Sequence, residues 1–268
     1  MNKYFTLIFL LIILFVNAVV ILSANVSGYE NLLIDLTQEN HLFESGTFLL
    51  LFVSGIYLII KQKTSSEHYI RAFLIFLSLI SFIAAFEEIS WTQHWFEFES
   101  TEYFKENNMQ QETNLHNFIP SVFFSTVIYT FIYATFILLP LLNSATQNIK
   151  LLQNRYIQIL MPTYTMTLVA TFAMSLQVYH IQEYIADVAT TIACAFLALV
   201  VYVKSYKVRT KSELLLLLLV IASIATFMLN NSIFYITNRQ YEIREFVLVF
   251  LYLVWVSNLV NRNKYIQK

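Results

Sequence analysis

Long apolar runs separated by short polar connections dominate the sequence. A helix needs about 20 mainly apolar residues to cross the ~30 Å hydrocarbon core of a bilayer, and eight runs approach that length. The pattern predicts an all-α fold: a polytopic transmembrane helical bundle that forms a single integral membrane domain over residues 1–268. The expected spans lie near residues 4–23, 46–60, 69–87, 118–142, 157–178, 184–203, 214–236 and 246–261, of which the second and the last are short.

The composition supports this interpretation. Hydrophobic residues make up 58% of the chain and charged residues only 12%, against about 25% charged residues in a typical soluble domain. Such a chain cannot cover itself with polar surface, so we expect a membrane protein whose first partner is the lipid bilayer. Three glycines and three prolines leave little material for broken helices, which predicts continuous spans. The single Cys194 excludes a disulfide within the chain and a cysteine-ligated metal cluster.

The charged residues are sorted by sign along the chain. Every basic residue except Lys105, Arg239 and Arg244 falls in the N-terminal segment, an even-numbered connection or the C-terminal segment. The positive-inside rule makes these segments cytoplasmic, which predicts that both termini are cytoplasmic. All acidic residues except Glu67 and Glu213 then face outside. This acidic outer face argues against nucleic acid as a partner, and the sequence does not indicate a protein partner.

The first apolar run allows two interpretations. Lys3, the following apolar stretch and the small residues of "ILSAN" resemble a secretory signal peptide. The run is about twenty residues long, however, and the apolar region of a signal peptide has about 7–15. We therefore expect an uncleaved membrane anchor, and cleavage that leaves seven spans is the alternative.

The longest connection between predicted spans is an outer one, from Ser90 to Asn117. Within it, Ser100 and Thr101 are candidate N-caps for a short helix at the outer membrane surface. Pro120 fits the first turn of the next span, where a missing N–H costs nothing.

Carboxylates and imidazoles gather at the predicted outer ends of the spans. Glu112 and His116 are four residues apart, and His180, Glu183 and Asp187 are spaced by three and four, so each set would share one face of a helix. Helical bundles build zinc, di-iron or di-manganese sites from such side chains on facing helices. These five residues are therefore predicted ligands of a divalent metal such as zinc, and the sequence does not identify the metal.

Two adjacent carboxylates, Glu87 and Glu88, end the third predicted span and are the candidate catalytic residues, with one acting as a general base. On a helical wheel Glu88 lies nearer the small residues Ser81 and Ala85, which favours it as the inward-facing carboxylate. Substrate binding is predicted for the other polar side chains at this level: Asn114, Asn230, Asn231, Arg239 and Arg244.

Plainer interpretations compete with this site. Glu87 and Glu88 are equally typical of a solvated helix end, and His116 and His180 of imidazoles at a membrane boundary. The tryptophans and many of the tyrosines are typical of an aromatic belt at headgroup level. Asp187 and the pair Asn230-Asn231 fit a plain interpretation less well, because a charge at the centre of a span costs up to ~3 kcal/mol and polar groups there normally face the bundle interior.

The stretches "EEISW" at 87–91 and "NNMQQETNLHN" at 107–117 resemble a family of uncharacterised bacterial multi-span membrane proteins with the pattern E-E-x-S-W-G-Q followed by N-x-Q-x-E-x-N-L-H-N. The resemblance covers about thirty residues, implies a bacterial cytoplasmic (inner) membrane protein and implies no activity. This chain departs from the pattern at Thr92 and His94, where the family has glycine and arginine. The matching positions are Glu87, Glu88, Ser90, Trp91, Gln93, Asn108, Gln110, Glu112, Asn114, Leu115, His116 and Asn117.

Three classes of function fit these residues. The first is an outward-facing, metal-assisted hydrolase or transferase that acts on a lipid or lipid-linked substrate. The second is a non-catalytic membrane component that binds a protein partner through its acidic outer loops. The third, a transporter, is less favoured because carriers commonly use helices interrupted by glycine or proline, and this chain has few of either.

The sorting of charges generates a prediction about orientation. A cysteine introduced at Ser100 should react with a membrane-impermeant thiol reagent added to intact cells, whereas one at Ser205 should react only after lysis. The reverse labelling would place the basic connections outside and would contradict the positive-inside assignment.

Overall fold

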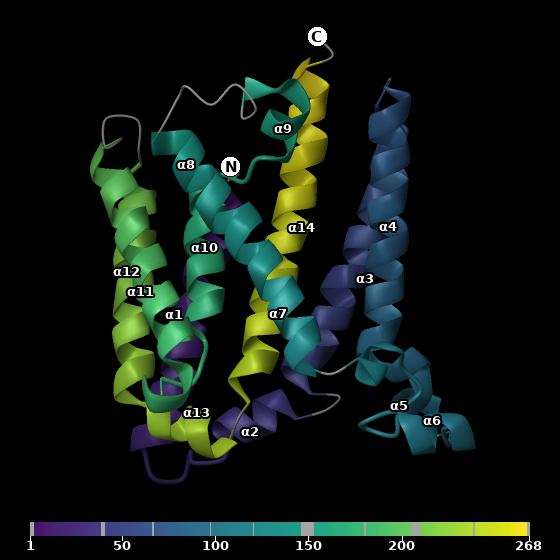
Figure 1. Ribbon diagram of the computed structural model, residues 1–268, viewed down its shortest axis with the longest axis vertical. Helices are drawn as coiled ribbons and strands as arrows, with labels where there is room; N and C mark the ends of the chain where they lie inside the picture. Colours follow the sequence, from purple (N-terminus) through teal and green to yellow (C-terminus); the bar gives the residue numbers. More distant parts are fainter. Residues whose placement is uncertain are drawn as a thin grey trace. The chain divides into compact units, whose positions relative to one another are not determined.

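The computed structural model describes residues 3–266 except 39–40, 66, 97, 120, 146–152, 180, 205–209 and 238. All regular structure in these residues is helical, which confirms the predicted all-α fold (Figure 1). The longer helices are α1 Lys3–Asn25, α3 Leu42–Gln62, α4 His68–Glu88, α7 Ser121–Ile132, α10 Tyr164–Ser175, α11 Ile181–Lys204, α12 Lys211–Leu229 and α14 Gln240–Ile266. The shorter ones are α2 Leu32–Thr37, α5 Gln93–Phe96, α6 Glu102–Asn107, α8 Leu139–Ala145, α9 Arg155–Leu160 and α13 Asn231–Thr237, with η1 Ser90–Thr92, η2 His116–Phe118 and η3 Tyr133–Leu138.

Six helical stretches in the described part of the chain are long and apolar enough to cross a membrane. The chain is therefore an integral, multi-pass membrane protein. These stretches are Tyr4–Asn25, Leu32–Gln62, His68–Glu88, Ser125–Asn143, Lys211–Leu229 and Gln240–Arg262. The span expected near 184–203 corresponds to α11, of which Val188–Lys204 is a shorter apolar helix, and the span expected near 157–178 is interrupted.

The chain forms two compact units. Unit 1 comprises residues 1–37 and 131–251, and unit 2 comprises residues 38–130 and 252–268. Each is described below by itself.

The first interruption in unit 1 contradicts the expectation of continuous spans. Helix α9 ends at Leu160, and α10 begins only at Tyr164. Pro162 has no amide hydrogen and disfavours helical dihedrals in the residue before it, and Met161 is accordingly extended (φ −60°, ψ 121°). Thr163 then caps α10 by accepting a hydrogen bond from the amide of Met166. The prediction was wrong because it weighed the number of prolines and not their positions.

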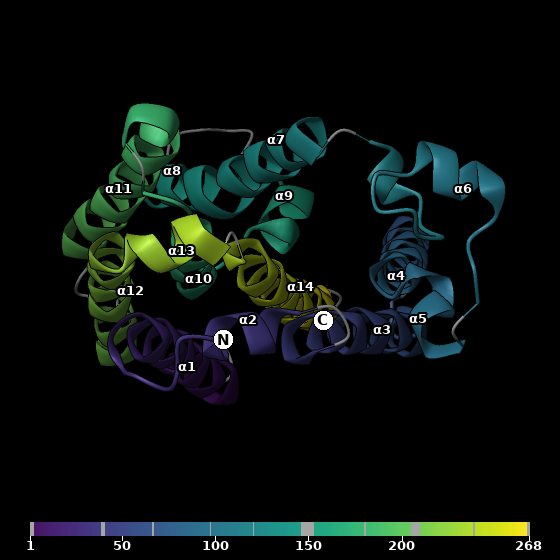
Figure 2. The same cartoon turned by 90° about the horizontal axis from the view of Figure 1, so that it is seen from below.

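Helix α10 is the core of unit 1, and each of its twelve residues is buried. It is surrounded by α1, α8, α11 and α12 (Figure 2). At 1.5 Å per residue it is about 18 Å long, too short to cross a bilayer as a helix. The chain continues through residues 176–179 without helical structure, and we call these four residues the unwound segment.

Two further irregularities lie in the predicted spans of unit 1. The helix that enters the unit becomes a π-helix at Tyr133–Leu138, just before Pro140, whose ring and missing N–H disturb a regular α-helix. Helix α12 ends at Leu229, and Asn230 (φ −107°, ψ 24°) separates it from α13. This second irregularity lies at the pair Asn230-Asn231, the polar residues within the seventh predicted span.

Helix α1 packs as a full member of unit 1. Phe9 and Val16 are completely buried, and the Phe9 ring packs edge-on against Phe250. The Asn17 side chain donates a 2.7 Å hydrogen bond to the Ser223 hydroxyl of α12. Helix α1 thus contributes to the core of unit 1.

Unit 2 is built on the antiparallel pair α3 and α4. Small residues let these two helices approach closely: a side chain added at Gly55 would place its Cβ 2.9 Å from the Phe82 ring. The Ser78 hydroxyl donates a 2.8 Å hydrogen bond to the Gly55 carbonyl. The buried stripe of α4 continues through Ser81 and Ala85 toward the end of the helix. This pair carries the loop that follows Glu88.

Candidate functional site

The loop that leaves α4 begins with a strained turn. Ser90, Trp91 and Thr92 have φ angles of 47°, 53° and 71°, in the left-handed region. That region costs a residue other than glycine roughly 1–2 kcal/mol, and it is rare for a β-branched residue such as threonine. Gln111, with φ 61°, repeats the strain further along. We call residues 89–119 the motif loop, since it contains most of the residues that carry the family resemblance.

Glu112 lies at the centre of a partly buried hydrogen-bond network in the motif loop. Its Oε2 accepts a 2.6 Å bond from the Ser90 hydroxyl and a 2.8 Å bond from the Asn114 amide. The Asn108 amide in turn donates to the backbone and side-chain oxygens of Asn114, at 2.8 and 2.9 Å. Ser90 and Asn114 are both 1% exposed. The carboxylate therefore ties the strained turn to the far end of the loop.

Glu87 makes a second connection, from the last turn of α4. Its Oε1 accepts from the Trp91 indole at 2.5 Å, and its Oε2 accepts from the Leu115 backbone amide at 2.6 Å. The Trp91 ring also stacks on Phe86, with ring centroids 5.6 Å apart. The Leu115 bond places the backbone of residue 116 beside the end of α4.

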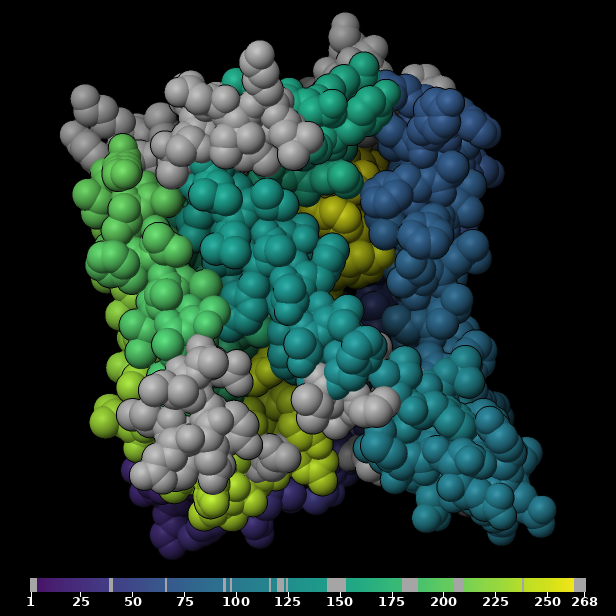
Figure 3. Space-filling view, in the orientation of Figure 1, coloured from purple at the N-terminus to yellow at the C-terminus, as the bar shows by residue number. Residues whose placement is uncertain are grey.

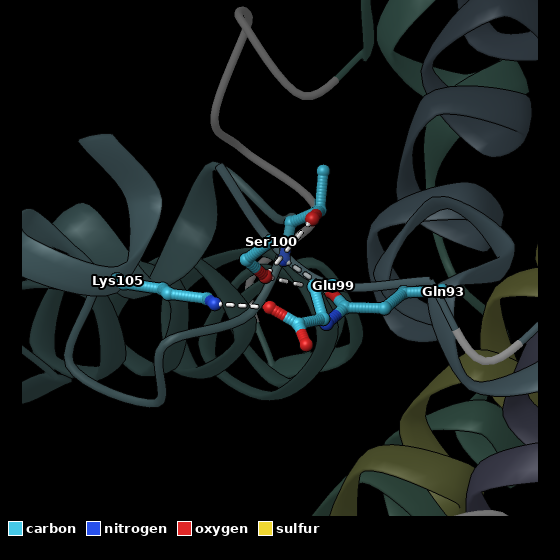
Figure 4. A network of polar contacts seen from close by, with 5 residues as sticks. Gln93, Glu99, Ser100 and Lys105 are labelled. Atoms are coloured by element: carbon cyan, nitrogen blue, oxygen red, sulfur yellow. Dashed lines mark hydrogen bonds and ion pairs between the residues drawn. The ribbon is translucent and has the colours of Figure 1, made fainter. Parts of the chain in front are cut away.

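The Gln93 side chain makes a third connection (Figure 4). Its oxygen accepts from the Thr113 backbone amide at 2.6 Å and from the Ser100 hydroxyl at 3.2 Å. Close by, Lys105 donates a 2.6 Å bond to Glu99, and this ion pair lowers the pKa of Glu99. Glu99 and Lys105 are exposed, so the pair contributes little to stability.

These bonds are sufficient to hold the strained turn. Three left-handed residues cost roughly 3–6 kcal/mol together. A hydrogen bond to a charged group is worth about 1.5–3 kcal/mol, and a neutral one about 1 kcal/mol. The two partly buried bonds to Glu112, the more exposed bonds to Glu87 and the bonds to Gln93 together match or exceed that cost. The motif side chains thus serve first to fold the loop.

The structure corrects one prediction about this region. Glu112 and His116 were expected on one face of a helix, but residues 111–115 are not helical and Gln111 is left-handed. The Asn108 side chain accepts from the amides of Gln110 and Glu112, at 2.9 and 3.3 Å, and so competes with a helix there. The short helix expected after Ser100 and Thr101 is present as α6, although the Thr101 side chain does not cap it.

In unit 1, two of the residues predicted to bind substrate, Arg244 and Asn231, bond to the backbone of the unwound segment. Arg244 is 8% exposed, and its Nε donates a 2.9 Å bond to the Leu176 carbonyl, which its Nη2 also contacts. The Asn231 side chain accepts from the Tyr179 backbone amide at 2.6 Å. Asn230 accepts a 2.6 Å bond from Asn25 of α1.

Side chains of the unwound segment add to this polar region. The Gln177 amide donates a 3.0 Å bond to the Thr191 hydroxyl of α11, and the Tyr179 hydroxyl donates to the Ser175 carbonyl at 2.7 Å. Tyr133, in the π-helix, and Arg244 both lie within electrostatic range of the Tyr179 hydroxyl. Reasoning from sequence missed the unwound segment. The signal that could have found it is Pro162, because this proline prevents a continuous helix over residues 157–178.

The predicted metal ligands are only partly described. His180 and the side chains of His116, Glu183 and Asp187 lie outside the described residues. The backbone of α11 is helical from Ile181, so Glu183 and Asp187 are one turn apart on one helix. Among the described residues, no group of three or more His, Cys, Asp or Glu side chains could hold a metal ion. The metal site stays a prediction.

Comparison of the chain with known protein families, curated proteins and solved structures gave no match. The resemblance of the motif loop therefore has to be judged on the geometry of its own residues. Nine of its matching positions, Glu87 included, make side-chain hydrogen bonds in or to the motif loop, and Thr92, where the resemblance would place glycine, has the left-handed φ of 71° that favours glycine. The geometry thus supplies a physical reason for the pattern.

The strain at Thr92 generates a test. Thr92→Gly should raise the free energy of unfolding by about 0.5–1 kcal/mol, because relief of roughly 1–2 kcal/mol of strain outweighs the greater entropy of glycine in the unfolded chain. Thermal unfolding of the purified protein in detergent would measure the change. Thr101→Gly is the matched control, since Thr101 has an ordinary φ of −64°, and it should lower stability. A loss of stability in both variants would contradict the strain.

Arg244 provides a test in unit 1. Arg244→Leu should lower the free energy of unfolding by about 1–3 kcal/mol, because it leaves the buried Leu176 carbonyl without its donor. Arg239→Leu, at a half-buried position five residues before Arg244, should have a smaller effect. Unfolding in detergent would measure both free energies. If the two variants lose the same free energy of unfolding, the hydrogen bond to Leu176 does not stabilise unit 1.

Proposed function

We propose that this chain is a membrane-embedded hydrolase or transferase that acts on a lipid or lipid-linked substrate at the outer membrane surface, with its reacting groups at the end of α4. The observation that carries this proposal is the strained motif loop. Left-handed residues in a rigid, hydrogen-bonded turn are a form of strain that accumulates at active sites. Here the strain occurs beside two adjacent carboxylates and a histidine.

The motif residues divide into two groups in this proposal. Glu87, Gln93, Asn108, Glu112 and Asn114 hold the loop through the bonds described above. Glu88 and His116 carry the chemistry. The hydrogen bond from the Leu115 amide to Glu87 supports joint action of Glu88 and His116. It brings the backbone of Leu115, the neighbour of His116, to the end of the helix that contains Glu88. We call the five residues that hold the loop the frame. Reacting groups on a loop supported by such a frame are positioned more precisely than those on an unsupported loop.

Glu88 would act as the general base. It accepts the proton of a water or hydroxyl nucleophile as that oxygen attacks the phosphoryl or acyl centre of the substrate. His116 would donate a proton to the leaving oxygen. General acid–base catalysis of this kind contributes about 10²–10⁴-fold to a rate. A divalent metal such as zinc, if bound at His116, would polarise the substrate in addition.

The broken span of unit 1 favours a second candidate function, transport of a polar solute or headgroup. Transporters commonly bind their substrates where a membrane helix is interrupted. Helices α9 and α10 are interrupted at Pro162, and the unwound segment beyond α10 contacts a buried arginine. The sequence-based objection to a transporter was the lack of broken helices, and this finding removes it.

The first function can be tested by lipid analysis. Cells that produce the wild-type chain should show a changed lipid or lipid-linked profile by mass spectrometry, and Glu88→Gln and His116→Ala should reduce that change by about 10²-fold or more. Thermal unfolding of both variants in detergent would separate a loss of chemistry from a loss of folding. Metal analysis of the purified wild type beside His116→Ala would test the metal-assisted form.

Glu87→Gln and Glu112→Gln serve as controls for the frame. Both should lower the unfolding temperature, whereas Glu99→Gln, at an exposed ion pair, should leave stability and lipid profile unchanged. A wild-type lipid profile in the Glu88→Gln variant would exclude the proposed base. A profile that is the same with and without the protein would favour transport.

A further inference from the structure

The motif loop exposes large aromatic side chains although it is rigidly folded. Trp95 is 54% exposed, Phe96 74% and Phe98 42%. A loop that meets only water gains nothing from this arrangement, because its internal network already satisfies its polar groups and its aromatic rings would be solvated at a cost. The three side chains lie within four positions of one another, and we call them the aromatic edge.

The aromatic edge lies close in sequence to the end of a predicted membrane span. Helix α4, a membrane-spanning candidate, ends at Glu88, and α5 begins only five residues later at Gln93. The Trp95 ring packs edge-on against Phe48 of α3, with ring centroids 5.2 Å apart. Apolar side chains exposed on the pair, such as Leu49 and Ile83, continue toward the same end. Figure 3 shows the motif loop as a lobe at the end of α4.

The charges of the motif loop identify the kind of lipid contact. Residues 89–119 contain five glutamates and a single lysine. Glu102, Lys105 and Glu106 are exposed on α6. Electrostatic attachment to anionic lipid requires clusters of basic residues, so this acidic loop cannot attach in that way. Burial of aromatic rings at headgroup level requires no basic residues.

We propose that the aromatic edge of Trp95, Phe96 and Phe98 is inserted in the lipid headgroup layer at the end of α4, with zwitterionic lipid as its partner. The exposed charges of α6 remain in water. The loop is then a membrane-surface element, and its hydrogen-bond network holds the three rings in position before they meet lipid. This inference rests on the spans and the exposure of the rings, and it holds whether or not Glu88 is catalytic.

Spin labelling of the full chain tests the inference. Single cysteines at Phe96, Phe98, Glu102 and Glu106 would carry a nitroxide in protein reconstituted into phosphatidylcholine vesicles. Cys194 is buried and can stay in place, with the unmodified chain as the labelling control. Labels at 96 and 98 should collide more often with oxygen, which partitions into lipid, than with a water-soluble nickel chelate. Labels at 102 and 106 should show the opposite ratio.

Lipid composition and salt distinguish the source of the attachment. Replacing a third of the phosphatidylcholine by phosphatidylglycerol, or raising the salt from 0.1 to about 1 M, should leave the ratios at 96 and 98 unchanged, because no basic cluster is involved. Water-like ratios at 96 and 98 would overturn the inference. So would labels at these positions that neither reagent reaches, which would indicate a protein partner or a second copy of the chain on the aromatic edge.

Discussion

Backbone N–H and C=O groups that leave a helix within a bilayer find no water there, so the protein must supply their hydrogen-bond partners. In unit 1 the unwound segment presents backbone groups outside any helix, and Arg244 and Asn231 bond to two of them. At the end of α4 in unit 2, the Glu87 and Gln93 side chains accept from the backbone amides of the motif loop. In both places the polar side chains that stand out in the sequence are partners of the backbone. Their first contribution is to make an irregular chain path stable beside lipid.

The spans could be predicted from sequence because a membrane helix depends on length and local composition. The third expected span, residues 69–87, differs from α4 by one residue at each end. The same reasoning failed at residues 157–178, where the apolar composition continues through Pro162 but the helix cannot. A proline ends or distorts a helix at a definite residue, whatever the total number of prolines in the chain. The π-helix before Pro140 follows the same rule.

The candidate site was less predictable because its bonds join residues far apart in the sequence. The sequence singled out Glu112, yet the Ser90 and Asn114 side chains that bond to it come from opposite ends of the loop. The spacing of Glu112 and His116 has meaning only on a helix, and the Asn108 side chain takes the amide bonds that such a helix needs. Residue spacing predicts contacts within regular elements. It does not predict contacts that a folded loop creates.

The two adjacent carboxylates at the end of α4 illustrate how one helix end can combine support and chemistry. Successive residues differ by about 100° around a helix, so Glu87 and Glu88 cannot face the same neighbours. Both oxygens of Glu87 accept hydrogen bonds from the motif loop. A carboxylate held in this way fixes the loop. Glu88, one turn beyond the buried Ala85, is half-buried. The two carboxylates thus have different surroundings: Glu87 binds the motif loop, and Glu88 is the proposed general base beside it.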